Sequence, residues 1–150
     1  MIGTEFVRGQ GLGNQLFVYV TARAIAKERG CVFGTAGREQ FANNIHSQRG
    51  MYFMDIDLGE EITPEAASKM ARFDDDDTRL FMGTSRHDLA HGCYISGAKE
   101  TIHEVADGTL LCGNLQDESY FERYRDELAG WLKVKPEADS HEYTADDLRI

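Results

Sequence analysis

Three short stretches of the sequence hold residue types that could do chemistry. GQGLGNQ, at residues 9–15, combines three side-chain amides with three glycines of the kind found in loops that cradle phosphate groups. HDLAH, at residues 87–91, holds two histidines at helical spacing, which suits zinc. DID, at residues 55–57, could hold a divalent metal and, through it, a diphosphate. Each of these chemical interpretations competes with a purely structural one.

The glycine-rich stretch departs from the nucleotide-binding fingerprints. A dinucleotide site requires G-x-G-x-x-G, and here the third glycine, Gly13, comes one position early. The segment after the next helix, CVFGTAG at residues 31–37, supplies no acidic residue for a ribose. The sequence also contains no G-x-x-x-x-G-K-[ST] loop of the kind that binds ATP. On this pattern alone, a tight turn from strand to helix explains the glycines best.

The two histidines fit a zinc protease poorly. Asp88 follows His87 where such enzymes carry a glutamate as general base, and Gly92 would end the helix directly after His91. We therefore expect both histidines to lie exposed in a loop.

The acidic and sulfur-containing side chains indicate no metal centre. Asp55 and Asp57 are expected to be exposed carboxylates on one face of a strand, because Asp-x-Asp is a short and common pattern. The aspartates at 74–77 are expected to form a solvated loop. The cysteines contain no C-x-x-C pair, which favours buried, reduced thiols over metal or redox chemistry. They are Cys31, Cys93 and Cys112.

Length and charge narrow the class of protein. The 150 residues correspond to one domain that can bury a hydrophobic core. A formal charge of −10 argues against DNA or an anionic membrane surface as partner. No stretch has the length of a membrane span, and no signal-peptide pattern is present. We expect a cytoplasmic protein and leave open whether MIGTEF, at residues 1–6, belongs to the fold.

The N-terminal quarter predicts a β-α-β unit. A short apolar run at residues 4–9 is typical of a strand, and residues 14–30 show the pattern of a buried helix. Asn14 is the predicted N-cap, and Gly30 suits the position after the last turn. A second strand is predicted at 31–34, so the two strands should lie parallel in one sheet.

The rest of the chain predicts two more helices and one buried strand. Residues 63–73 open with a threonine cap and a proline, which favours a helix. Residues 109–116 predict a buried strand, and 117–133 predict an amphipathic helix with a capping box over 119–122. Residues 80–108 are expected to be loop with short pieces of structure.

The glycine-rich turn and its helix resemble the N-terminus of the α-1,2-fucosyltransferase family. Members of that family open with a strand, then G-G-L-G-N-Q-[LM]-[FW]-x-Y, then a helix with A-R-A-[LI]-A. Later in this chain, FMDIDLG at 53–59 and the strand-and-helix segment at 110–132 are similar to further family segments in order and distance. The residues that match in the opening motif are Gly11, Leu12, Gly13, Asn14, Gln15, Leu16, Phe17, Tyr19, Ala22, Arg23 and Ala26. Those that match in the later segment are Gly113, Leu115, Gln116, Asp117, Tyr120 and Phe121.

The resemblance implies a fold, a reaction and a site. The fold would be α/β, a Rossmann-like parallel sheet with flanking helices, similar to the N-terminal lobe of a GT-B-type glycosyltransferase. The reaction would transfer fucose from GDP-fucose, with inversion, to the 2-hydroxyl of a galactoside, without a metal or cofactor. No catalytic residue is identified. The implied substrate-binding residues are Gly11, Gly13, Asn14, Gln15 and Gln116.

One departure from the family pattern affects the expected activity. Family members continue with a strand and an H-x-R-R-G-D-Y-like motif, whose arginines hold the donor diphosphate, whereas this chain ends at DDLRI, residues 146–150. We therefore expect residues 1–150 to be a single N-terminal lobe without the donor-binding lobe, and inactive alone. Its partners would be a nucleotide sugar and a glycan acceptor. The missing lobe, or a second copy of the chain, would cover its exposed apolar face.

Two alternatives remain open at this stage. The chain could be a non-catalytic α/β module that binds a nucleotide or a sugar, or a structural domain whose glycine turn does nothing chemical. Neither reading includes a nucleic-acid partner or a transmembrane segment. Peripheral attachment to a membrane is left open.

Overall fold

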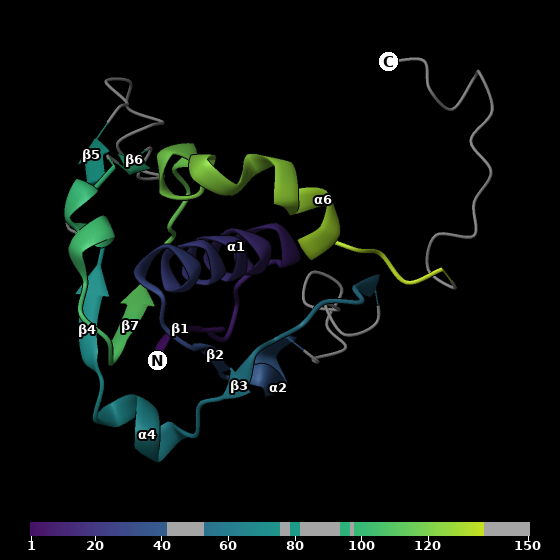
Figure 1. The fold of residues 1–150 in the computed structure, drawn as a ribbon, viewed down its shortest axis with the longest axis horizontal. Helices are drawn as coiled ribbons and strands as arrows, with labels where there is room; N and C mark the ends of the chain where they lie inside the picture. The colour runs from purple at the N-terminus through teal and green to yellow at the C-terminus, as the bar shows by residue number, and fades with distance from the viewer. Residues whose placement is uncertain (42–52, 76–78, 82–93, 97, 137–150) are drawn as a thin grey trace.

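A five-stranded, all-parallel sheet forms the centre of the molecule. The structure is a computed structural model that describes residues 1–41, 53–75, 79–81, 94–96 and 98–136. The strand order is β3-β2-β1-β7-β4, with helices flanking the sheet (Figure 1). The chain thus has an α/β, Rossmann-like fold, as the β-α-β pattern predicts. The strands are β1 (Ile2–Glu5), β2 (Phe33–Ala36), β3 (Glu60–Glu61), β4 (Ala71–Asp74) and β7 (Thr109–Cys112).

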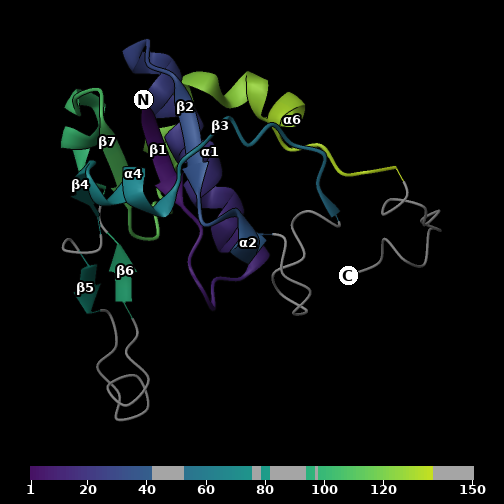
Figure 2. The same ribbon diagram turned by 90° about the horizontal axis from the view of Figure 1, so that it is seen from below.

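Helices and one hairpin complete the described structure. The antiparallel hairpin of β5 (Arg79–Phe81) and β6 (Tyr94–Ser96) extends beyond the carboxyl ends of β4 and β7 (Figure 2). The helices are α1 (Leu12–Arg29), α2 (Arg38–Phe41), α4 (Pro64–Ser68) and α6 (Leu128–Trp131). Three 3₁₀ segments are η2 (Glu100–Glu104), η3 (Glu118–Tyr120) and η4 (Glu122–Glu127).

Strand β1 is the central strand of the sheet. It pairs with β2 on one side and β7 on the other, with Gly3 opposite both Gly34 and Leu110. Ile2 is fully buried and Phe6 is 1% exposed. The strand predicted at 4–9 therefore lies earlier, and MIGTEF forms an integral part of the fold. The residues from Val7 onward form an exposed turn at the carboxyl edge of the sheet.

Helix α1 covers one face of the sheet. It contacts β1, β2 and β7, and its apolar side chains lie in the main core. Gly30 ends the helix in the left-handed region with φ 67°, and its N–H bonds the carbonyls of Ala26 and Lys27, as the sequence predicts. The segment from η3 to α6 packs beside α1 on the same side of the sheet, where Trp131 lies under the Arg23 guanidinium at 4.6 Å.

The opposite face of the sheet is covered by a short crossing segment. The chain leaves β3 and runs over β2 and β1, so Ile62 packs directly on the two glycines Gly3 and Gly34. A Cβ on Gly3 would lie 2.4 Å from Ile62 Cδ1, which explains why the strand carries glycine there. Figure 2 shows α4, which continues this segment, on the face opposite α1.

The structure confirms only the first half of the helix predicted over 63–73. Thr63 caps α4 by accepting a hydrogen bond from the Ala66 N–H at 3.1 Å, and Pro64 is the first helical residue. The helix ends at Ser68, however, because the following residues Ala71–Asp74 pair with β7 as edge strand β4. Tertiary strand pairing overrides the helical pattern of this segment.

The amphipathic helix predicted over 117–133 is broken into three pieces. Segments η3, η4 and α6 follow one another, and Tyr124 has non-helical angles inside η4. The predicted Ser119–Glu122 capping box is wrong, since the Asp117 carboxylate accepts the Ser119 N–H at 2.9 Å. The predicted apolar face is confirmed: its side chains pack on the main core. They are Phe121, Tyr124, Leu128, Trp131 and Leu132.

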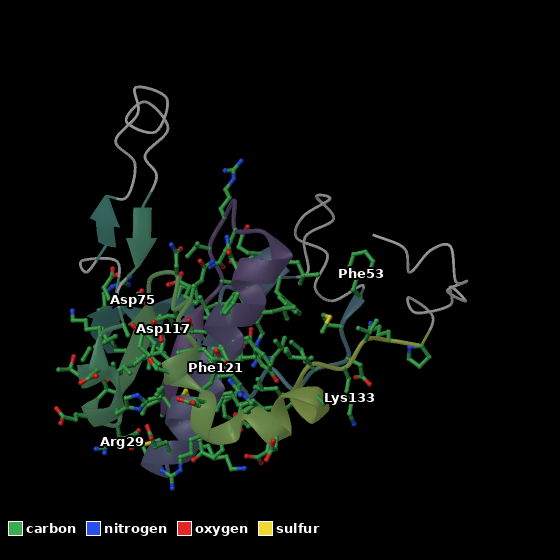
Figure 3. The ribbon with its side chains drawn as sticks, turned by 90° about the horizontal axis from the view of Figure 1, so that it is seen from above. Arg29, Phe53, Asp75, Asp117, Phe121 and Lys133 are labelled. Carbon is green, nitrogen blue, oxygen red and sulfur yellow. The ribbon has the colours of Figure 1, made fainter. Side chains whose placement is uncertain are left out.

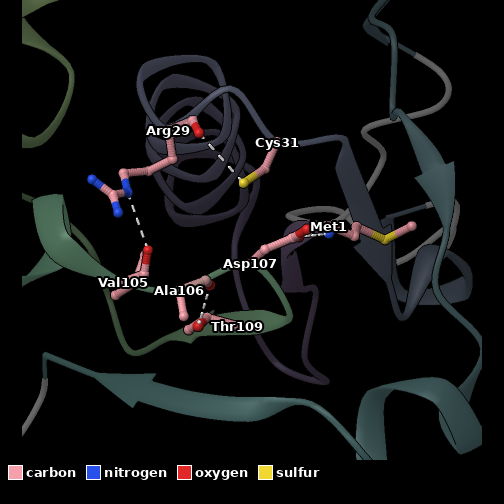
Figure 4. A network of polar contacts seen from close by, with 7 residues as sticks. All are labelled: Met1, Arg29, Cys31, Val105, Ala106, Asp107 and Thr109. Atoms are coloured by element: carbon pink, nitrogen blue, oxygen red, sulfur yellow. Dashed lines mark hydrogen bonds and ion pairs between the residues drawn. The ribbon is translucent and has the colours of Figure 1, made fainter.

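Polar contacts of the turn before β7 connect neighbouring elements at the amino-terminal edge of the sheet (Figure 4). Arg29, in the last turn of α1, donates from Nε to the Val105 carbonyl at 3.2 Å. The Met1 ammonium pairs with the Asp107 carboxylate, and Thr109 Oγ1 donates to the Ala106 carbonyl at 2.7 Å. These bonds join the C-terminus of α1, the start of β1 and the start of β7.

The aspartate run is not the solvated loop that its composition predicts. Asp74 is the last residue of β4, and Asp75 is fully buried. Residues 76 and 77 lie outside the described residues. Among the helices that the structure describes, none combines the length and hydrophobicity that crossing a bilayer requires.

Candidate functional site

A pocket of about 380 Å³ opens at the carboxyl ends of β1, β7 and β4. The strand order reverses between β1 and β7, and ligands of open parallel sheets bind at this kind of position. We call it the carboxyl-edge pocket. The wall from β1 and its turn comprises Glu5, Val7, Arg8, Gly9, Gln10 and Asn14. The wall from β4 and β7 comprises Arg72, Asp74, Cys112, Gly113 and Asn114.

The turn from β1 into α1 differs in detail from its prediction. Gly9, not Gly11 or Gly13, takes the left-handed conformation, with φ 86°. Gly11 is the N-cap of α1 with φ −71°, and Gly13 lies within the first turn of the helix. Neither is among the pocket-lining residues, although Gly9 is. The turn closes locally, since the Gln10 N–H donates to the Val7 carbonyl at 3.3 Å.

Asn14 has a different role from the N-cap that the sequence predicts. The helix starts at Leu12, so Asn14 is its third residue, and α1 has no side-chain cap. Asn14 is exposed and lines the carboxyl-edge pocket. Its side chain is therefore available for contacts outside the helix.

Two of the predicted site residues, from distant segments, meet beside the pocket. The Gln116 Nε2 donates a hydrogen bond to the Asn14 Oδ1 across 102 positions of sequence. This bond uses the Asn14 carbonyl and leaves its amide donors to other partners. It joins the turn after β1 to the turn after β7, on the two sides of the point where the strand order reverses.

Gln15 is separated from the other predicted site residues. Its side chain is fully buried, and its Nε2 donates to the Gln40 carbonyl at 3.1 Å. It connects α1 to α2 beneath the turn and does not line the carboxyl-edge pocket. Its sequence neighbour Asn14, by contrast, is exposed, because one step along a helix turns a side chain by 100°.

Tyr19 and Arg23 of the opening motif also have structural roles in this protein. The Tyr19 hydroxyl donates to the Asp57 carbonyl at 2.8 Å and accepts from Arg23 Nη1 at 2.6 Å. Burial raises the pKa of Tyr19, which the neighbouring Arg23 partly offsets. These contacts hold α1 against the loop before β3, away from the carboxyl-edge pocket.

Four charged side chains in the pocket were missed by the sequence analysis. Glu5 and Arg8 come from β1 and its turn, whereas Arg72 and Asp74 come from the edge strand β4. Glu5 is half-buried and the other three are exposed. For Arg72 and Asp74, the signal that could have found them is the alternation of β4, which its helix-like composition conceals. The pocket thus combines two carboxylates and two guanidinium groups with the amide of Asn14.

The surroundings of the Cys112 thiol in the pocket disfavour its thiolate form. Burial raises its pKa above the usual value, and the carboxylates of Asp74 and Glu5 raise it further. The Arg72 guanidinium lowers the pKa, but only in part. The thiol is therefore protonated at neutral pH, whereas cysteine catalysis needs a thiolate. Cys31 and Cys112 are both partly exposed, which departs from the buried thiols expected, and Cys93 lies outside the described residues.

The turn after β7 holds an unusual backbone conformation. Gly113 has φ 100°, and Leu115 has φ 50°, a left-handed conformation that costs a leucine about 1–3 kcal/mol. Leu115 is fully buried, and both of its peptide groups are bound. Its N–H donates to Asp75 Oδ1 at 3.3 Å, and its carbonyl accepts from Thr21 Oγ1 at 3.2 Å.

The structure gives no support to a metal site in the part of the chain that it describes. Asp55 and Asp57 are exposed, as expected, but they lie in a loop rather than a strand. One Asp57 oxygen accepts the Gly59 N–H at 2.8 Å, which is a turn contact. The described residues contain no group of three or more potential metal ligands. His87 and His91 lie outside them.

Comparison of this chain with protein-family models, with curated proteins and with solved structures finds no match. What the structure establishes is a Rossmann-like parallel sheet with a polar pocket at its carboxyl edge.

Proposed function

We propose that this chain is the acceptor-side lobe of a GDP-fucose-dependent α-1,2-fucosyltransferase of the GT-B type. The contact between Asn14 and Gln116 carries the proposal. These two residues come from the two sequence segments that most resemble the family, and the resemblance implies that both bind substrate. Their hydrogen bond at the edge of a polar pocket brings them close enough to contact one substrate.

The chemistry of the carboxyl-edge pocket suits a neutral sugar. Each hydroxyl group of a sugar both donates and accepts hydrogen bonds, so a site that binds a sugar needs donor and acceptor groups in alternation. The Asn14 amide and the guanidinium groups of Arg8 and Arg72 donate, and the carboxylates of Glu5 and Asp74 accept. The volume of about 380 Å³ lies in the range of small-molecule sites.

In the proposed reaction, the acceptor 2-hydroxyl attacks the fucose carbon that bears the diphosphate. A C–O bond forms while the bond to the diphosphate breaks, GDP leaves, and the hydroxyl proton passes to a carboxylate or to water. The pocket carboxylates Glu5 and Asp74 are the described groups placed to accept that proton. Departure of the diphosphate requires cationic stabilisation, which the proposal assigns to a second lobe.

One observation favours the alternative, a non-catalytic module that binds a nucleotide or a sugar. Arg8 and Arg72 line the same pocket, and two guanidinium groups are well suited to a diphosphate. Against this, Glu5 and Asp74 would repel the same ligand. A nucleotide that binds the isolated chain tightly, without any sugar, would favour this alternative.

The test of the proposal measures sugar binding and fucosyl transfer separately. The isotope-labelled chain is titrated with methyl β-galactoside, and the side-chain amide signals of Asn14 and Gln116 are followed by NMR. We expect both signals to shift. Methyl 2-deoxy-β-galactoside, which lacks the accepting hydroxyl, is the control and should bind more weakly. Transfer is measured as GDP release from GDP-fucose, and the chain alone should show none.

The substitution Asn14→Ala separates substrate binding from architecture. Because Asn14 does not cap α1, its loss should cost less than about 1 kcal/mol of stability. In a full-length protein that contains both lobes, turnover should fall by one to several orders of magnitude, roughly 2–4 kcal/mol of transition-state stabilisation. Near-normal turnover of this variant, with no signal shift in the galactoside titration, would contradict the proposal.

A further inference from the structure

Asp75 is a fully buried carboxylate that the carboxyl-edge pocket does not contain. It follows β4 directly and lies at the base of the β5–β6 hairpin (Figure 3). Its Oδ1 accepts from the Leu115 N–H at 3.3 Å, and its Oδ2 accepts from the Tyr120 hydroxyl at 3.2 Å. A buried carboxylate is tolerated when donors of this kind surround it. Neither the predicted site nor the proposed reaction gives Asp75 a role.

Tyr120 connects Asp75 to a third segment. Its hydroxyl, which is buried with the ring, also accepts from the Lys99 N–H at 2.9 Å. Asp75 precedes the hairpin and Lys99 follows it, so the one hydroxyl binds both ends of this insertion. Burial and the adjacent Asp75 carboxylate raise the pKa of Tyr120 to about 12, so the hydroxyl keeps its proton over the physiological range.

The turn after β7 is held between this pair and helix α1. Asp75 binds the N–H of Leu115, and Thr21 binds its carbonyl, so the peptide groups on both sides of the left-handed residue are fixed. Gln116 is the next residue, and it reaches Asn14 from this position. A change at Leu115 would therefore turn Gln116 away from Asn14.

We propose that Asp75, held by Tyr120, is a positioning residue: it fixes Leu115 in the left-handed conformation and so places Gln116 against Asn14 at the carboxyl-edge pocket. The proposal rests on the proposed function only for the identity of the ligand. The geometry of the turn can be tested without any ligand, so failure of this inference and failure of the fucosyltransferase proposal are distinguishable.

The experiment compares two phenol-to-phenyl substitutions in the same segment by NMR and amide hydrogen exchange. Tyr120→Phe removes the hydroxyl that binds Asp75, and Tyr124→Phe is the matched control outside this network. The readouts are the exchange rate of the Leu115 amide, that of the Leu110 amide inside β7, and the Gln116 side-chain amide signal. Asp75→Asn, which keeps Oδ1 as acceptor for Leu115, tests rescue by a conservative change.

We expect Tyr120→Phe to accelerate exchange at Leu115 at least tenfold more than at Leu110, and to move the Gln116 side-chain signal. Tyr124→Phe should do neither. Asp75→Asn should give a smaller acceleration than Tyr120→Phe, since the asparagine keeps an acceptor for Leu115 and still has the Tyr120 hydroxyl beside it, whereas Tyr120→Phe leaves the carboxylate without that support. Equal acceleration at Leu115 and Leu110, with an unmoved Gln116 signal, would show a purely structural role and overturn the proposal.

Binding of methyl β-galactoside provides a second measurement on the same variants. If the pocket takes this sugar, Tyr120→Phe should weaken binding at least tenfold, although Tyr120 does not line the pocket. Unchanged binding in that variant would overturn the proposal. Absence of binding to the wild-type chain would count against the fucosyltransferase proposal alone, because the exchange measurement would still decide the role of Asp75.

Discussion

Two turns leave the carboxyl edge of the sheet side by side, and they hold their shapes by opposite means. The turn after β1 places glycine at its left-handed position, and a Cβ on Gly9 would meet no atom within 4 Å. The turn after β7 also contains a glycine with positive φ, Gly113, but it places a buried leucine in the left-handed region as well and binds both of that residue's peptide groups to distant segments. The first turn is encoded by its own residues, whereas the second is imposed by residues far away in the sequence.

The largest effect should come from shortening the leucine of the second turn. Leu115→Ala removes a fully buried side chain, so unfolding free energy should fall by about 2–5 kcal/mol in urea denaturation. Alanine keeps the strain of the left-handed conformation but loses the packing that offsets it. A loss below about 1 kcal/mol would mean that the hydrogen bonds to distant segments hold the turn and that burial of the leucine contributes little, which would sharpen the comparison.

High pH should destabilise the turn after β7 but not the turn after β1. The pKa of Tyr120 rises from 10.0 to about 12 on folding, so its contribution is fully present below pH 10 and is lost as the pH rises toward 12. The shift corresponds to about 2–3 kcal/mol. Urea denaturation between pH 9 and pH 12 should therefore show a steeper fall in stability for the wild type than for Tyr120→Phe. Parallel curves for the two proteins would argue against a buried, protonated hydroxyl.

The smallest effects should come from the glycines of the first turn, and they should differ in sign. Gly9→Ala forces a side chain into the left-handed region and should cost about 1–2 kcal/mol, although the space around it is open. Gly13→Ala lies in the first turn of α1, also in open space, and should stabilise the protein by up to about 1 kcal/mol. Thermal unfolding of both variants measures the two changes in stability. A loss of stability in both would mean that the turn is held by contacts beyond its own residues.

The contrast between the turns also explains what the sequence could predict. The β-α-β unit, the left-handed Gly30 and the threonine cap of α4 depend on neighbouring residues, and all three were predicted. The edge strand β4 and the kinked segment after β7 depend on distant partners, and their composition suggested helices instead. Local patterns indicate local structure, and tertiary pairing can override them.

The residues of the candidate site also divide into those that a local pattern indicates and those that depend on distant partners. The motifs supplied Asn14 and Gln116, but no pattern indicated that a hydrogen bond joins them or that Gln15 is buried away from the pocket. Arg72 and Asp74 were missed because they reach the pocket only when β4 pairs with β7. The sequence predicts a solvent-exposed Asp75, since a run of aspartates carries no sign of the tyrosine that binds one of them 45 residues later.

The central position of β1 has a consequence for how this chain folds. Gly3 and Leu110 are paired neighbours, yet 107 residues separate them along the chain. During synthesis, β1 and β2 can pair early, but the sheet cannot be completed until β7 has left the ribosome. Non-local parallel pairing of this kind slows folding, because the loop-closure entropy is lost before the contact forms. Until then the edge of β1 stays unpaired, and an unpaired strand edge can pair with another chain.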